Sequence, residues 1–184
     1  RTTFGNVQHE AGEAFFVGFA VLGFIVAVDR AYTEKPTFAH LRDGDFGVLS
    51  GAVLGGLALA AYMLTWPAAV YLLAPFGAFL LIQMVRDDLN DRSTEYLGLS
   101  VATVFFVAFG PVAIYTFLVG GYGRVSGPAL SALHPAALLA AGVGALFLHF
   151  LREFLQGDDK PEDAYPVAVG GVVLVGLVFL LVTG

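Results

Sequence analysis

The chain has 184 residues, of which 58% are hydrophobic and 13% are charged, and its mean hydropathy is +0.80. A soluble domain carries about 25% charged residues, so this composition excludes an ordinary water-soluble fold. Asp and Glu (15) outnumber Lys and Arg (9), the net charge is −6, and no residue is Cys. A nucleic-acid-binding surface, disulfides and thiolate chemistry are therefore excluded.

Six apolar segments with almost no internal charge follow one another along the chain, roughly at residues 13–28, 47–65, 68–85, 97–119, 135–155 and 164–183. Each approaches the ~20 residues that a helix needs to cross a hydrocarbon core of ~30 Å. Because backbone amides in lipid must bond within their own segment, we expect six helices. The sequence predicts an all-α, polytopic integral membrane bundle that forms one transmembrane domain over residues 1–184.

The stretch before the first span contains His9 and Glu13, which would share a face if this stretch is helical. His134, at the start of the fifth span, falls on the same side of the membrane. Two imidazoles and one carboxylate can hold a metal ion. The plainer alternative, which we favour, is that Glu10 and Glu13 only stabilise the N-terminus of a helix.

The second span contains Gly47, Gly51 and Gly55, which recur every four residues. Such glycines line one helix face and let a neighbouring backbone approach closely. We expect this face to pack inside the bundle, with a second copy or a membrane protein partner as the alternative.

Pro75 and Pro111 lie mid-way along the third and fourth spans. A proline inside a helix frees a carbonyl and kinks the helix. Broken helices near the membrane midplane build the binding sites of many transporters, so this pair suggests a small-solute transport module as an alternative function.

Asp87, Asp88 and Asp91 follow the third span in the form DDxxD, which prenyl-transfer enzymes use to hold Mg²⁺ and a diphosphate. Asp87 and Asp91 would share a face if the helix continued, and Mg²⁺ prefers such oxygen ligands. The triad therefore suggests a Mg²⁺-dependent lipid-diphosphate enzyme as a second alternative. Carboxylates that merely solvate a loop are the interpretation we favour.

His149 is the most deeply placed ionisable side chain, and Arg152 and Glu153 share its helix face. It could ligate a haem or metal, or handle a proton. The alternative is an interfacial histidine bonded to Glu153 or to a carbonyl. No cofactor is required by the sequence.

Basic residues predict the orientation of the bundle. One side holds seven of them, against Arg1 and Arg124 on the other: Arg30, Lys35, Arg42, Arg86, Arg92, Arg152 and Lys160. The positive-inside rule places the seven, with their charged loops, in the cytoplasm, so both termini are outside.

Acidic loops and scarce Lys are typical of a salt-adapted archaeal protein, so we expect a multi-pass protein of an archaeal plasma membrane. The spans lack ionisable groups near the midplane, which argues against ion-coupled chemistry. We therefore expect a non-enzymatic accessory subunit of a larger membrane assembly. Its partners would be the lipid bilayer and either a membrane protein or a second copy of the chain.

Overall fold

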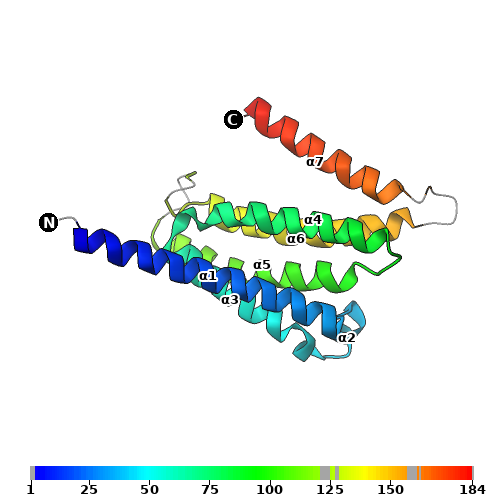
Figure 1. The fold of residues 1–184 in the computed structure, drawn as a ribbon, viewed down its shortest axis with the longest axis horizontal. Coiled ribbons are helices and arrows are strands. Elements are labelled where there is room, and N and C mark those ends of the chain that lie inside the picture. The colour runs from blue at the N-terminus through cyan, green and yellow to red at the C-terminus, as the bar shows by residue number, and fades with distance from the viewer. Residues whose placement is uncertain (1–2, 121–124, 127–128, 157–160, 162, 184) are drawn as a thin grey trace.

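The computed structural model describes residues 3–120, 125–126, 129–156, 161 and 163–183, with side chains described within residues 11–174. The described residues form helices and connecting turns. In chain order these helices are α1 Thr3–Glu34, α2 Phe38–Arg42, η1 Phe46–Leu49, α3 Ser50–Thr65, η2 Pro67–Leu72, α4 Leu73–Asp88, α5 Glu95–Leu118, α6 Leu133–Leu155 and α7 Ala164–Thr183. Figure 1 shows the start of α1 and the end of α7 at the same end of the bundle.

Five stretches are long and apolar enough to cross a membrane: Ala11–Glu34, Phe46–Thr65, Pro67–Asp88, Glu95–Leu118 and Leu133–Leu155. They coincide with the first five predicted spans. The sixth predicted span coincides with α7, whose described apolar part is Ala164–Leu174. The prediction of an all-helical, multi-pass membrane bundle is confirmed.

The core of the bundle lies along α3 and α5. Of the 18 most apolar consecutive residues in each of the spans Phe46–Thr65 and Glu95–Leu118, 56% are buried. The corresponding share is 17% in Ala11–Glu34 and 28% in Pro67–Asp88. In the first half of α5 the residues on every face are buried, from Tyr96 to Ala102, whereas Ile114, Phe117 and Leu118 near its end are exposed. A helix that is apolar all round belongs in the interior, and α5 accordingly packs against both α3 and α6.

Small residues bring α1 and α3 into close contact. A Cβ built on Gly55 would lie 2.7 Å from the carbonyl oxygen of Gly23, and one built on Gly23 would lie 3.0 Å from Cβ of Ala58. A Cβ built on Gly51 would lie 3.1 Å from the aliphatic stem of Arg30. Gly47 lies apart from this seam because it belongs to η1, where a Cβ would meet only Asp45.

Pro75 does not interrupt a continuous helix. The predicted third span divides into η2 and α4, and Pro75 is the third residue of α4. A proline in the first turn removes an N–H that has no partner within its helix, so it fits there without a mid-helix kink. Pro111 does lie inside α5. Only one of the two helix kinks on which the transport interpretation depends therefore remains, at Pro111.

Candidate functional site

A groove of about 580 Å³ lies between α1 and α4 and reaches the start of α5. Val21 and Ile25 line it from α1, and Phe79 lines it from α4. The rings of Phe24 and Phe76 stack with centroids 3.9 Å apart and join the two helices. Because α1 packs mainly on α3 while α4 packs on α6, an apolar trough remains between them. Its volume falls within the roughly 300–1,000 Å³ of small-molecule sites.

The groove becomes polar where α4 ends. Asp29, Arg86 and Arg92 line this end. The Arg92 guanidinium donates a hydrogen bond to the Tyr32 hydroxyl, with Nη1 to Oη 3.0 Å. The Tyr32 ring packs edge-on against Tyr96, with centroids 6.0 Å apart. These contacts hold the Arg92 guanidinium at the mouth of the trough.

A second cavity of about 420 Å³, which we call the basic cup, shares three residues with the groove. It is lined by Tyr32, Lys35, Thr37, Arg92, Ser93, Glu95 and Tyr96. Tyr32, Arg92 and Tyr96 line both cavities. Groove and cup are therefore neighbouring parts of one site, apolar along its length and cationic at one end.

The end of α1 places Lys35 in the cup. Lys35 has φ +48°, and its N–H bonds to the carbonyl of Ala31 at 2.9 Å. Pro36 follows, and proline is common just past a helix end because it cannot continue the helix. Thr37 then caps α2, with its side chain accepting from the N–H of His40. The backbone conformation of this turn therefore places the Lys35 side chain in the lining of the cup.

Asp87 organises the turn that carries Arg92. Its carboxylate accepts hydrogen bonds from the Tyr96 hydroxyl at 2.6 Å and from the Gln83 amide at 3.0 Å. Its backbone carbonyl accepts the N–H of Arg92 at 2.8 Å. Asp87 is 1% exposed, so these donors take the place of water.

Asp87 and Asp91 do not share one helix face, because the helix does not continue to Asp91. α4 ends at Asp88, and the chain turns through Asp91 at φ +54°. Asp87 binds Tyr96 and Gln83, whereas Asp88 binds α6. Among the side chains that the structure describes, no group of three His, Asp or Glu could hold a metal ion.

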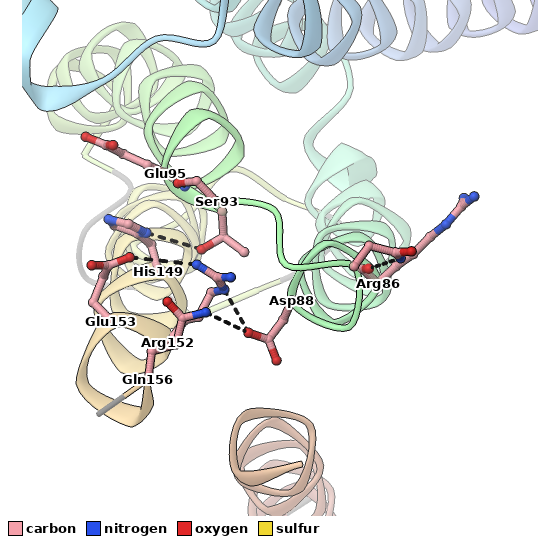
Figure 2. A network of polar contacts seen from close by, with 10 residues as sticks. Arg86, Asp88, Ser93, Glu95, His149, Arg152, Glu153 and Gln156 are labelled. Carbon is pink, nitrogen blue, oxygen red and sulfur yellow. Dashed lines mark hydrogen bonds and ion pairs between the residues drawn. The ribbon is translucent and has the colours of Figure 1, made fainter. Parts of the chain in front are cut away.

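Asp88 and Arg152 form a buried ion pair between α4 and α6 (Figure 2). Arg152 Nε lies 2.8 Å from Asp88 Oδ1, and the side chains are 4% and 7% exposed. Gln156 adds a longer bond to the same oxygen at 3.4 Å. Glu153, at 3.8 Å from Arg152, is exposed. The pair joins the end of α4 to the end of α6.

His149 lies beside this pair with its own partners. Its Nδ1 is 3.2 Å from the Thr94 hydroxyl, and its ring packs against Phe38 and Phe150. The residue is 4% exposed. Within the described part of the chain, the partner of this nitrogen is therefore a threonine hydroxyl, where Glu153 or a carbonyl was expected. A cofactor or proton role for His149 stays a prediction.

On the opposite side of the bundle, His134 is fully buried. Its Nε2 lies 2.7 Å from the Pro67 carbonyl, and its Nδ1 faces Ser131. These contacts tie α6 to the short hairpin between α3 and α4. The side chain of His9 lies outside the described residues, so the His9, Glu13 and His134 metal site stays a prediction.

Sequence reasoning missed the groove and its cup. From the sequence, Arg86, Arg92 and Lys35 contributed only to the number of basic residues on one side of the membrane. The signal available was two arginines and two tyrosines near the ends of predicted spans. Only the separation of α1 from α4 turns these residues into a site.

Comparison with known proteins gives one strong sequence relative. No family model matches the chain. The dolichyl-monophosphooligosaccharide–protein glycotransferase AglB of Haloferax volcanii is 34% identical over 182 residues, which cover 95% of this chain and 16% of that protein. The chain thus corresponds to a small part of its relative. The relative's archaeal origin agrees with the origin expected from composition.

Two solved structures have the same fold. Both are of the Archaeoglobus fulgidus oligosaccharyltransferase, one with an inhibitory peptide and a dolichol-phosphate and the other tethered to an acceptor peptide. Their TM-scores are 0.73 and 0.74, at 22% and 20% identity, over 94% of this chain and 20% of each of those chains. At this level of identity, the similarity shows that the chain and these structures share an arrangement of helices.

These comparisons contradict the expected function. The relatives that match nearly the whole chain are glycosyltransferases, so the expectation of a non-enzymatic accessory subunit is wrong, and so is its transport alternative. The lipid-diphosphate enzyme built on Asp87, Asp88 and Asp91 is not supported either, because Asp87 and Asp88 are engaged by other side chains and α4 stops before Asp91.

Proposed function

We propose that these helices belong to the membrane-embedded part of a protein glycosyltransferase whose donor is an oligosaccharide carried on a dolichyl monophosphate. The observation that carries this proposal is the 34% identity to the Haloferax enzyme over 95% of the chain. The shared fold with the Archaeoglobus enzyme supports it. In this proposal the helices form a scaffold that keeps a lipid-linked donor and the rest of the enzyme in register within the membrane.

A chimera tests this function. The matching segment of the Haloferax enzyme is replaced by this chain, and the chimera is produced in a Haloferax strain that lacks its own enzyme. We expect glycosylation of a reporter glycoprotein to return, because a segment with the same fold should preserve the contacts that the rest of the enzyme needs. The measurement is the mass shift of the reporter.

The matched control is the same chimera carrying Gly55→Leu, which should lose glycosylation because it forces α1 away from α3. A chimera that accumulates in the membrane at the normal level but leaves the reporter unmodified would contradict the proposal.

We also propose that the ends bearing the basic cup and the Asp88–Arg152 pair face the cytoplasm of an archaeal cell, across its plasma membrane. The support is the uneven distribution of basic residues, seven on this side against two on the other. A partner protein or a second copy of the chain remains a prediction, which cross-linking in native membranes would test.

A further inference from the structure

We propose that the groove between α1 and α4, together with the basic cup, binds an anionic membrane phospholipid, with its phosphate at Lys35 and Arg92 and one chain along the groove. This lipid is a resident of the fold and is distinct from the glycosyl donor of the proposed function. The proposal therefore stands or falls separately from that function.

The first argument is charge. Within the described part of the chain, no carboxylate lies within ion-pair distance of Lys35, Arg86 or Arg92. Two acids line the cavities: Glu95 accepts the N–H of Phe38 at 2.7 Å, and Asp29 lies at the groove mouth. The Asp87 carboxylate lies buried behind the lining, where it accepts bonds from Tyr96 and Gln83. Three cations against two acids in the lining itself favour a phosphate.

The second argument is where these cations lie along α1. Ile25 lines the apolar trough, whereas Lys35 lies ten residues further on, at the end of the helix. Ten residues correspond to about 15 Å along a helix, half of the ~30 Å hydrocarbon core. A chain lying in the trough therefore has its headgroup at the height of Lys35, where Arg and Lys side chains meet the membrane interface.

The third argument is preorganisation. Arg92 is already held by the Tyr32 hydroxyl, and the turn that carries it is held by the Asp87 carbonyl. Lys35 itself adopts the left-handed backbone conformation just after α1, which sets the direction in which its side chain leaves the backbone. A headgroup that binds here pays little to order these side chains.

Native mass spectrometry of the complete protein, released from nanodiscs, tests the proposal. The probes are dioleoyl phosphatidylglycerol and uncharged dioleoylglycerol. We expect one phosphatidylglycerol to remain bound and the uncharged lipid to be lost. The double variant Lys35→Gln, Arg92→Gln should bind phosphatidylglycerol weaker by on the order of tenfold or more, because each cation near the membrane surface attracts anionic lipid.

Two further variants make the result specific. Arg42→Gln removes a cation from the same side of the membrane but outside both cavities, since its side chain is 83% exposed and pairs with Asp43, and it should bind as the unmodified protein does. Ile25→Trp fills the trough without touching a cation and should also weaken retention.

Equal retention by the double variant and the unmodified protein would overturn the proposal. So would selective retention of dolichol phosphate over phosphatidylglycerol, which would make the groove a donor site. Failure of a lipid-soluble maleimide to label Ile25→Cys, with no lipid retained, would show that another helix covers the groove and would also overturn it.

Discussion

At the scale of single residues, the two adjacent aspartates at the end of α4 are each satisfied by specific donors. Asp87 is satisfied by neutral donors, Tyr96 and Gln83, whereas Asp88 is satisfied by the Arg152 guanidinium. The two adjacent carboxylates therefore make different contacts. Asp87 joins α4 to α5, and Asp88 joins α4 to α6. Their proximity in sequence suggests a shared metal ion, but adjacent residues on a helix project in different directions.

The buried ion pair gives the first prediction. Arg152→Met should lower the free energy of unfolding by about 3–5 kcal/mol, because it leaves Asp88 buried without a cation. The double variant Asp88→Leu, Arg152→Met should recover most of this loss, since two apolar side chains replace a pair that is expensive to desolvate. Reversible unfolding in mixed detergent micelles measures both. A double variant as unstable as Arg152→Met would contradict this account.

A second prediction concerns the partner of His149. Thr94→Val should destabilise the protein by about 1–3 kcal/mol, because the buried imidazole nitrogen then loses the hydroxyl 3.2 Å away. Thr103→Val is the control and should change stability little, because among the described residues the Thr103 hydroxyl bonds only to the Leu99 carbonyl one turn back in α5, at 2.8 Å. Thermal unfolding of the two variants checks the difference. Equal midpoints would show that the Thr94 contact contributes nothing.

At the scale of elements, glycine has opposite meanings in α3 and α4. Gly55 faces the backbone of Gly23 at a distance that no Cβ tolerates, whereas a Cβ on Gly77 would meet nothing within 4 Å. Glycine is therefore required for helix packing at Gly55 in α3. At Gly77 in α4 it only lowers the helix stability. The spacing of the glycines in sequence does not separate these cases.

The third prediction uses this contrast. Gly55→Ala should destabilise the bundle by about 1–3 kcal/mol, because α1 and α3 must move apart. Gly77→Ala should be neutral or stabilising by up to about 1 kcal/mol, because alanine is the better helix former and space is free. The measurement is the unfolding midpoint of each variant in detergent. A stabilising effect of Gly55→Ala would refute the α1–α3 seam.

At the scale of the whole molecule, the arrangement of helices separates a charged end from a mostly uncharged one. The ends of α1, α4 and α6 carry the basic cup and the Asp88–Arg152 pair, which lie together at one end of the bundle. The opposite end holds the buried His134 and the α3–α4 hairpin. This polarity leads to a test of orientation.

The fourth prediction concerns that orientation. Cys at Asp43, in the turn after α2, should react with a membrane-impermeant maleimide only after cells are opened, because this turn belongs to the basic side. Cys at Val125, which is 83% exposed and on the other side, should react in intact cells. Reaction of both positions in intact cells would contradict the predicted orientation.

The sequence by itself determined that this is a multi-pass helical membrane protein and roughly where its helices lie, because hydrophobic length and backbone hydrogen bonding in lipid act within each segment. It did not reveal that α4 stops at Asp88, that Asp88 turns to Arg152, or that α1 stands apart from α4. Those features depend on which helices pack together. Tertiary structure decided them, since a groove and a buried ion pair each need residues from different helices to meet.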